Sequence, residues 1–292
     1  NLRQHTYLDA QVCGRRSSDE RGALCKMVDR SDITNALIIA DRGYESYNLM
    51  AHIQEKGWKF LIRIKDIYSS GIASGLELPN SDEFDLYCPI QLTRRRKIET
   101  VPLFADKNHY KWIATSTPFD YLSAGSHKYD PIAFYYLPFR IVRFKLSDSS
   151  YETVITNLDA EYFPPEELKH LYGMRWGIET SFRELKYTVG LLHFHAKKVV
   201  NITQEIYARL IMYNFSELIT SHVVIQKFER KHPCKANFSV AVQVCRQFLL
   251  GNVSPPDVEA IIGKNLSVIR PGRNNPRNTV VKHAVSFLYR VA

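Results

Sequence analysis

The sequence predicts an α/β protein with a β-rich stretch in its middle and a helical, basic C-terminal part. Three observations support this fold class. Residues 1–66 alternate between strand and helix patterns, residues 67–147 hold only short β-rich runs, and the longest helical patterns come later. Of the 292 residues, 45% are apolar and 24% are charged, an ordinary globular composition that excludes a disordered chain.

The chain begins with a predicted strand and helix. Residues 7–12 predict a short strand. Ser17 and Glu20 have the spacing of a capping box, which predicts that a helix over residues 17–28 begins there.

A buried strand is predicted at residues 36–40, where a continuous apolar run ends at Asp41. A helix over residues 47–56 follows, with Gly57 suited to the position just after its end. Residues 58–64 predict the next strand. This alternation predicts a sheet with helices packed on it.

Residues 67–147 predict a β-rich insertion, because no helical period lasts there and Gly, Pro, Ser and Asp interrupt the pattern. Its short β-rich runs lie at residues 97–103, 111–115, 132–136 and 141–144. Trp112 is expected in the core of this insertion. Residues 151–157 predict a strand that resumes the first sheet.

The longest helical pattern starts at Pro164 and runs to about Val189, since Pro and acidic residues are favoured in a first helical turn. A second helix is predicted over residues 203–228. The tail after Pro255 is expected to be loosely ordered to about Val280.

Polar residues form one stripe along the longest predicted helix. At ~100° per residue, Tyr172, Arg175, Glu179 and Lys186 share this stripe. An apolar stripe lies beside it and consists of Leu171, Met174, Ile178, Phe182 and Leu185. A carboxylate at the border of the two stripes would be held firmly and would be reachable from a cleft. The alternative is that Glu179 only forms i,i+4 ion pairs on an exposed helix.

Asp41 lies at the carboxyl end of the predicted buried strand, where α/β sheets place ligands. Asp41 and Glu179 together are able to hold divalent metal, which prefers carboxylate oxygen. Two such ions would activate an attacking oxygen and stabilise the leaving oxygen of a phosphodiester. The alternative is that Asp41 is only a turn residue.

Basic charge favours a polyanionic partner. The formal net charge is +9, and the residues from Lys264 to the C-terminus include six Lys and Arg but no Asp or Glu. Arg94, Arg95, Arg96 and Lys97 form a second basic cluster. Nucleic acid is the default candidate, and a solvated basic surface is the alternative.

Other classes of site have little support in the sequence. The five cysteines are scattered without a CxxC pair, which argues against a disulfide framework and a structural zinc site. His193 and His195 flank Phe194, and are expected to make polar or DNA contacts rather than to ligate metal. No apolar run reaches ~18 residues, so no membrane-spanning helix is predicted.

The spacing of Tyr172, Arg175, Glu179 and Lys186 resembles the signature helix of the bacterial insertion-sequence DDE transposases of the IS-four type. The segment 40–44 around Asp41 resembles the strand end that carries the second catalytic Asp of that family. The resemblance implies an RNase H-like core interrupted by a β-rich insertion. The expected domains are a first core part at 1–66, the insertion at 67–147, a second core part at 148–228 and a basic C-terminal extension at 229–292.

The resemblance also implies roles for these residues. Asp41 would be the second catalytic acid and Glu179 the third, and both would bind Mg²⁺, for which Mn²⁺ would substitute. Arg175 and Lys186 would contact phosphates near the transposon end, and Tyr172 would support or contact the same DNA. The implied activity is DNA strand cleavage and transfer on double-stranded DNA, at transposon ends and target. A homodimer on DNA and a cytoplasmic, nucleoid-associated location are also implied.

One departure from the family pattern concerns the first catalytic Asp, whose Asp-Gly-Ser or Asp-Gly-Thr motif is not found in the sequence. We therefore expect a transposase truncated at its N-terminus and inactive as this fragment. Asp9 is an alternative first acid, although it lies close to Asp41 in the sequence. The alternative function is a non-catalytic DNA-binding remnant of a transposase. A structure-selective nuclease on the same fold is a third possibility.

Overall fold

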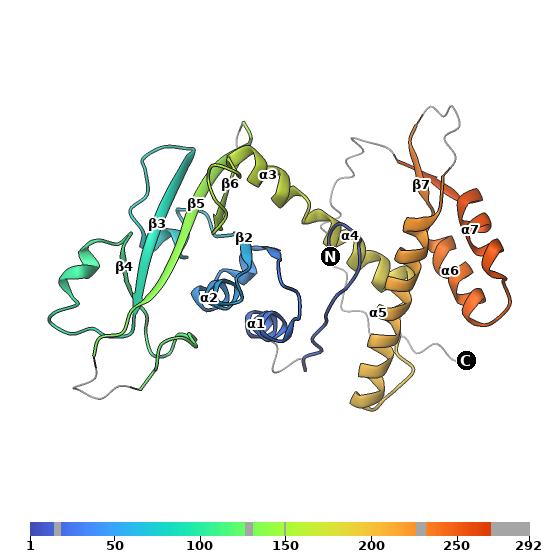
Figure 1. Ribbon diagram of the computed structural model, residues 1–292, viewed down its shortest axis with the longest axis horizontal. Helices are drawn as coiled ribbons and strands as arrows, with labels where there is room; N and C mark the ends of the chain where they lie inside the picture. Colours follow the sequence, from blue (N-terminus) through green and yellow to red (C-terminus); the bar gives the residue numbers. More distant parts are fainter. Residues whose placement is uncertain (15–18, 126–130, 149, 226–231, 270–292) are drawn as a thin grey trace. The chain divides into compact units, whose positions relative to one another are not determined.

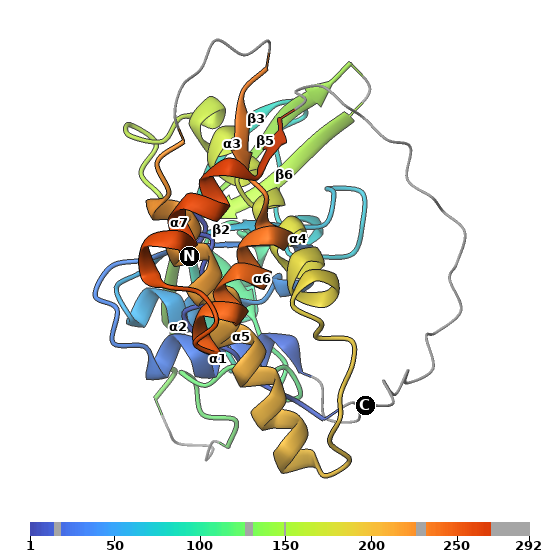
Figure 2. The same cartoon turned by 90° about the vertical axis from the view of Figure 1, so that its right-hand side faces the viewer.

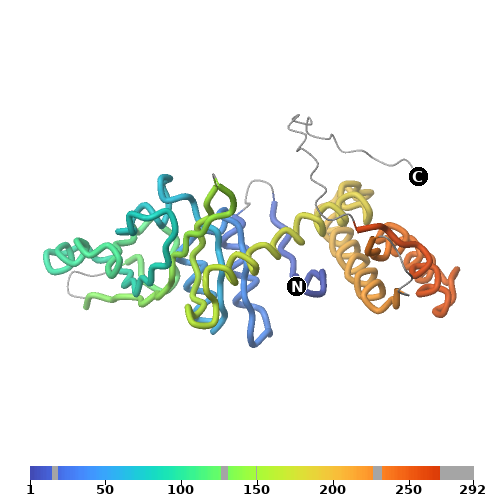
Figure 3. The backbone as a smooth tube through the Cα atoms, turned by 90° about the horizontal axis from the view of Figure 1, so that it is seen from above, coloured from blue at the N-terminus to red at the C-terminus, as the bar shows by residue number. Residues whose placement is uncertain are grey.

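The protein folds into two compact units, each described here by itself (Figure 1). The computed structural model describes residues 1–14, 19–125, 131–148, 150–225 and 232–269. The sheet unit is Gln11–Arg175, and the helical unit combines Asn1–Ala10 with Trp176–Ala292. The chain passes from the first to the second between α3 and α4 (Figure 3).

A six-stranded sheet in the order β1-β2-β6-β5-β3-β4 forms the centre of the sheet unit. Strands β1 and β2 are parallel, as are β3 and β4, and the other neighbours are antiparallel. The strands are β1 (Leu37–Ala40), β2 (Lys59–Arg63), β3 (Phe84–Thr93), β4 (Tyr110–Trp112), β5 (Tyr135–Ser147) and β6 (Ser150–Thr156). The sheet is therefore mixed, and the unit is α/β as predicted.

Helices cover both faces of this sheet. Helices α1 (Glu20–Arg30) and α2 (Tyr47–Glu55) pack on the face to which Phe60 and Ile62 of β2 point. Leu61, between them, points to the opposite face and packs with residues of α3 (Pro165–Gly173). Because side chains alternate along a strand, β2 contributes to both cores and is buried on both faces.

Several predicted elements are confirmed. The apolar run that precedes Asp41 is β1, and the strand that ends at residue 156 is β6. Helix α2 is followed by Gly57, which has a φ of 73° and occupies the left-handed conformation that glycine tolerates best.

The strand predicted at residues 7–12 is wrong. Tyr7 belongs to the helical unit, where its backbone is bound by a side chain instead of a neighbouring strand. The Tyr7 N–H donates to Asn214 Oδ1 at 2.8 Å, and Asn214 Nδ2 donates to the Tyr7 carbonyl at 2.7 Å. A side-chain amide thus satisfies the backbone groups that the prediction assigned to a sheet.

The first helix begins later than predicted. Its N-cap is Asp19, whose side chain accepts a hydrogen bond from the Gly22 N–H at 3.1 Å. Ser17, the predicted cap, lies outside the described residues.

The β-rich stretch is only partly as predicted. Residues 97–103 form turns and the start of a 3₁₀ helix, and the two runs predicted between residues 132 and 144 are one long strand, β5. Strand β3 was not predicted, because Pro89 reads as a strand breaker; in the sheet it faces Pro138 of β5. Strands β3, β4 and β5 extend the same sheet as β1, β2 and β6.

The long helix predicted from Pro164 is interrupted. It consists of α3, α4 (Trp176–Arg183) and the π-helical turn η5 (Glu184–Thr188). The N–H groups of Met174 and Arg175 bond three residues back, to Leu171 and Tyr172, which tightens the backbone and ends α3. Gly173 and Gly177 lower helix propensity there. The single polar stripe from Tyr172 to Lys186 therefore does not run along one continuous helix.

The helical unit contains a three-helix core and a short ribbon (Figures 1 and 2). Its further elements are α5 (Val199–His222), β7 (Cys234–Ala236), α6 (Phe238–Leu249), α7 (Pro255–Lys264) and β8 (Leu266–Val268). The expectation of a loosely ordered tail is wrong for residues 255–268. From residue 270 the tail lies outside the described residues. Within the described ranges, no helix is long and apolar enough to cross a membrane.

A buried histidine joins three segments of the sheet unit. His52 of α2 has a side chain only 9% exposed, and its two ring nitrogens lie 2.8 Å from Asp29 Oδ1 and from Asp120 Oδ2. Asn48 also binds Asp120, with Nδ2 to Oδ2 at 2.8 Å. Burial alone would lower the pKa of His52, but the hydrogen bonds to Asp120 and Asp29 outweigh it and raise the pKa.

We predict that His52→Gln destabilises the sheet unit most at low pH. The group with the raised pKa stabilises the fold fully below the ordinary His pKa of ~6.5, and this contribution is lost as the pH rises through the higher folded value. The expected loss at pH 5.5 is about 1–2 kcal/mol, because charged hydrogen bonds to half-exposed carboxylates are removed.

Urea unfolding at pH 5.5 and pH 9 measures this difference. His109→Gln is the matched control, since His109 also pairs with an aspartate, Asp106, but is 51% exposed and should contribute little at either pH. An equal loss for His52→Gln at the two pH values contradicts the prediction.

Candidate functional site

Asp41 lies where the sequence placed it, directly after β1 at the carboxyl end of a parallel strand. It caps the short 3₁₀ helix η2 (Arg42–Tyr44), and its Oδ1 accepts the Arg42 N–H at 2.7 Å. Its side chain is 40% exposed. The position is therefore both fixed by the backbone and reachable from solvent.

Arg63 binds Asp41 from the end of the neighbouring strand. Arg63 Nε lies 3.0 Å from Asp41 Oδ1, and Arg63 Nη1 lies 2.9 Å from Glu152 Oε1. The three residues come from β1's end, β2 and β6, three adjacent strands of the sheet. Because Glu152 is only 11% exposed, it holds the guanidinium in place beside Asp41.

Arg63 and Glu152 were not identified from the sequence. Both lie in strands, where an isolated charged residue gives no sign of its partner. One signal was available in the sequence. Arg63 directly follows the buried apolar run at residues 60–62, and a buried strand tolerates a charge only where it is paired.

Tyr172 of α3 lies near this group and is almost completely buried, at 3% exposure. Burial raises the pKa of Tyr172 to about 12, although the positive charges of Arg63 and Arg175 act in the opposite direction. Its hydroxyl has no hydrogen-bond partner among the described residues. The Arg175 guanidinium lies over its ring, 5.5 Å from the centroid.

Glu179 and Lys186 belong to the helical unit, Glu179 on α4 and Lys186 in η5. Both side chains are exposed. Since Asp41, Tyr172 and Arg175 belong to the sheet unit, the approach of Glu179 to Asp41 stays a prediction, and so do the assigned roles of all five residues.

The donor groups around Asp41 fit a divalent cation only in part. Carboxylate oxygen is what Mg²⁺ and Mn²⁺ prefer, and Asp41 is exposed enough to offer it. Among the described residues, however, no three His, Cys, Asp or Glu side chains are grouped to hold a metal ion. Asp41 and Glu179 are the residues that would hold one, and the sheet unit alone provides only the first.

The basic cluster at residues 94–97 is partly structural. The Arg94 guanidinium donates to four backbone carbonyl oxygens, and so fixes the loop before Leu122 rather than facing a polyanion. These oxygens belong to Ala114, Thr117, Phe119 and Leu122. Trp112, expected in the core, is instead 38% exposed, and Arg96 lies over its ring, 5.5 Å from the centroid.

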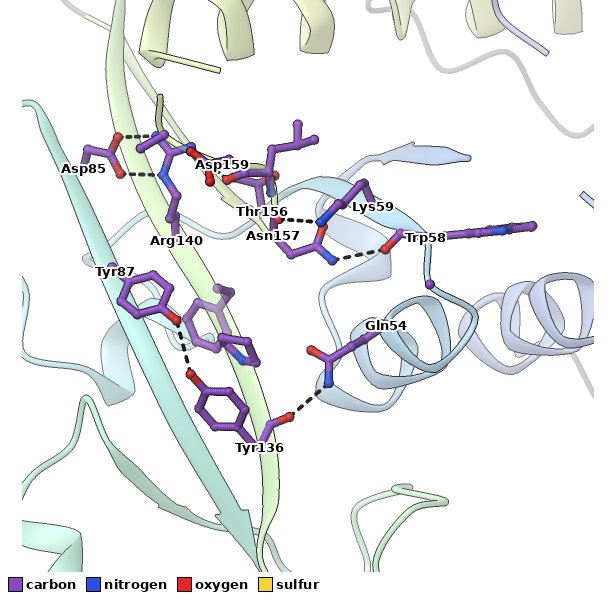
Figure 4. A pocket seen from close by; sticks show the side chains of 15 residues that line it. Gln54, Trp58, Lys59, Asp85, Tyr87, Tyr136, Arg140, Thr156, Asn157 and Asp159 are labelled. Carbon is purple, nitrogen blue, oxygen red and sulfur yellow. Dashed lines mark hydrogen bonds and ion pairs between the residues drawn. The ribbon is translucent and has the colours of Figure 1, made fainter. Parts of the chain in front are cut away.

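The sheet unit has a hollow whose polar lining residues form hydrogen bonds and ion pairs with one another (Figure 4). Arg140 pairs with Asp85 and also donates to the carbonyls of Leu158 and Phe163. Asn157 binds the backbone of β2, accepting the Phe60 N–H at 2.8 Å. These polar groups hold the end of the sheet together.

Two further carboxylates of the helical unit, Glu205 and Glu217, have distinct surroundings. Glu205 accepts the backbone N–H groups of His195 and Ala196, which holds the segment before α5. Burial raises the pKa of Glu217 to about 7, and the nearby charge of Glu184 adds to this shift.

The sheet unit is thus an α/β domain with a carboxylate at the end of a parallel strand, the position at which such sheets place their sites. Comparison with protein families matches residues 1–215 to the family described as the transposase DDE domain. The match covers more than half of the chain, which therefore belongs to this transposase family. A search among curated proteins finds no match.

We predict that Tyr172→Phe leaves the stability of the sheet unit unchanged or raises it by about 1 kcal/mol. The reason is that a buried hydroxyl without a partner costs free energy, and phenylalanine fills the same space without it. Thermal unfolding of the two proteins tests this. A loss of several kcal/mol would mean that the hydroxyl is bonded in solution.

Proposed function

We propose that this chain is the catalytic part of a transposase that cleaves DNA strands and transfers them by the two-metal DDE mechanism. Asp41 and Glu179 are the proposed catalytic and metal-binding acids. The observation that carries the proposal is Asp41 itself. It is an exposed carboxylate that the backbone fixes at the end of β1, in a chain of the transposase family.

The roles of the chain's own residues follow from their contacts. Arg63 holds the Asp41 carboxylate and is in turn held by Glu152, so the acid is positioned before any substrate arrives. Arg175 and Lys186 are proposed to bind DNA beside the acids, and the buried Tyr172 to support the Arg175 guanidinium that lies over its ring. Bound Mg²⁺ would supply activation of the attacking oxygen and stabilisation of the leaving oxygen.

The finer assignments rest on the resemblance of the Tyr172 to Lys186 spacing and of the Asp41 segment. We infer a bacterial insertion-sequence element of the IS-four type, an RNase H-like core and Mg²⁺ as the metal, with Mn²⁺ as a substitute. The substrates are double-stranded transposon ends and target DNA. The active species is a homodimer on DNA, associated with the nucleoid.

The second candidate is a non-catalytic DNA-binding remnant. It is favoured by one specific observation, that only the second and third acids are identified in the sequence. Asp9 does not occupy a strand position from which it could replace the first acid, because residues 7–12 form no strand.

We predict that the 292-residue chain binds duplex DNA but does not cleave it with Mg²⁺ or Mn²⁺. A longer protein that also contains the residues encoded in frame upstream should cleave DNA, where those residues include an Asp-Gly-Ser or Asp-Gly-Thr motif. In that extended chain, Asp41→Asn and Glu179→Gln should each reduce the cleavage rate by about 10³-fold or more while DNA binding persists.

A nicking assay on DNA that carries the ends of the element measures these rates. Glu77→Gln is the matched control, since Glu77 of the sheet unit is 63% exposed and lies outside the group of Asp41, Arg63 and Glu152. Robust cleavage by the 292-residue chain that disappears in Asp9→Ala would show that Asp9 is the first acid. No cleavage by the extended chain would favour the remnant.

We predict that Arg175→Ala and Lys186→Ala weaken DNA binding nearly equally on all sequences. Each should reduce the slope of log affinity against log salt by about one unit, since one phosphate contact is lost. Fluorescence anisotropy over a salt series measures the slope. Lys169→Ala is the control, because Lys169 of α3 already donates to the Lys145 carbonyl at 2.7 Å. Unchanged slopes would favour simple ion pairs on a solvated helix.

A further inference from the structure

The Asp41 carboxylate already has a fixed cation beside it. Its Oδ1 accepts the Arg42 N–H at 2.7 Å, and Arg63 Nε lies 3.0 Å from the same oxygen. Asp41 is therefore neutralised by an arginine of the neighbouring strand. This is an unusual setting for a carboxylate that is proposed to bind a divalent cation, because the guanidinium repels that cation.

The guanidinium has a second and more buried partner. Arg63 Nη1 donates a hydrogen bond to Glu152 Oε1 at 2.9 Å. The side chain of Glu152 is 11% exposed, whereas that of Asp41 is 40% exposed. Since an ion pair is weakened less by solvent where it is more buried, Arg63 is held mainly at Glu152 and reaches Asp41 from there.

A third acceptor in the same group is not used. The Tyr172 hydroxyl is buried and has no hydrogen-bond partner among the described residues. Burial raises the pKa of Tyr172, and the charges of Arg63, Asp41 and Glu152 also act on it, so this oxygen lies close to the ion pairs. An arginine has five N–H donors, and the unpaired hydroxyl oxygen is available to accept one of them.

These contacts define two ways to neutralise Asp41. In the first, Arg63 bridges Asp41 and Glu152, as the structure shows. In the second, a divalent cation takes Asp41, and the repelled guanidinium keeps its bond to Glu152 and gains the Tyr172 hydroxyl. The second state leaves no buried charge without a partner and satisfies the buried hydroxyl.

We propose that Arg63 is a positioning residue that competes with the divalent cation for Asp41, and that Glu152 and the Tyr172 hydroxyl receive its guanidinium when the cation binds. The inference rests on the proposed function in one respect, that Asp41 is a metal ligand. It adds a regulation of that site. The built-in cation keeps the metal-free carboxylate neutral and sets the concentration of metal at which the site fills.

The first experiment measures Mn²⁺ binding by the 292-residue chain from the electron paramagnetic resonance signal of the free ion. Arg63→Ala should tighten Mn²⁺ binding by about tenfold, because the competing charge is removed. Glu152→Gln should weaken it by about tenfold, because Arg63 then has only Asp41 as a charged partner. A merely structural role of the ion pair would move both affinities in the same direction.

A double variant guards against misfolding of Arg63→Ala, in which the buried Glu152 has lost its partner. The double variant Arg63→Gln with Glu152→Gln leaves no unpaired buried charge, and it should bind Mn²⁺ more tightly than Glu152→Gln alone. Melting temperatures show which variants fold.

An exposed ion pair of the sheet unit supplies the matched controls. Lys107 Nζ lies 3.7 Å from Glu77 Oε1, and both side chains are more than half exposed. Lys107→Ala and Glu77→Gln make the same changes of charge outside the group, and each should leave the Mn²⁺ affinity nearly unchanged.

The second experiment follows the Arg63 Nε–H resonance in ¹⁵N spectra, where it is identified by its loss in Arg63→Lys. Diamagnetic Mg²⁺ should shift this resonance, because the contact with Asp41 is lost, and Asp41→Asn should abolish the shift. Tyr172→Phe should weaken Mn²⁺ binding by roughly two- to tenfold, the effect of one lost hydrogen bond in the metal-bound state.

The outcomes separate this inference from the proposed function. Equal or weaker Mn²⁺ binding by Arg63→Ala, together with weaker binding by Asp41→Asn, overturns the competition and leaves Asp41 as a metal ligand. An Arg63 resonance that does not move at saturating Mg²⁺ also overturns it. Unchanged Mn²⁺ binding after Asp41→Asn removes the metal role of Asp41 and overturns both proposals.

Absence of Mn²⁺ binding by every variant overturns the competition as well, since Arg63→Ala leaves Asp41 with no competing cation. The nicking assay on the longer protein then decides the proposed function separately.

Discussion

The sheet unit depends on strand β2, which has a parallel neighbour on one side and an antiparallel neighbour on the other. Strand β2 is parallel to β1 and antiparallel to β6, so it joins the parallel start of the sheet to the long antiparallel part. The same arrangement brings Arg63 of β2 between Asp41, after β1, and Glu152 of β6. The register of the three strands therefore brings together the polar group at the proposed site, with Asp41 in the residue that directly follows β1.

Elements with strong local signals could be predicted from the sequence. Strand β1, helix α2 and Gly57 each follow from an apolar run, a helical period or a backbone preference, and these act over a few residues. Strand β3 could not be predicted, because Pro89 contradicts a strand unless Pro138 is known to lie opposite. The strand wrongly predicted near Tyr7 fails for a related reason, since its backbone partner, Asn214, lies far away in the sequence.

The candidate site was predictable to the same extent. A carboxylate after a buried strand is a local pattern, so the position of Asp41 was found. Arg63, the side chain that binds Asp41, was not predicted, because its contacts with Asp41 and Glu152 depend on which strands are neighbours in the sheet. The interruption of the long helix could not be predicted from hydrophobic periodicity either. Gly173 lowers helix propensity, but it does not by itself determine where the helix ends.

The register of β2 has a consequence for the time course of synthesis. Leu61 pairs with Thr156, so one edge of β2 has no partner until 95 further residues have been translated. At ~5–20 residues per second, this takes roughly 5–20 s. During that interval the nascent chain exposes an apolar strand with unpaired backbone groups. Ribosome-associated chaperones would then protect the emerging sheet, and slow codons placed between β2 and β6 would lengthen the period in which it is vulnerable to aggregation.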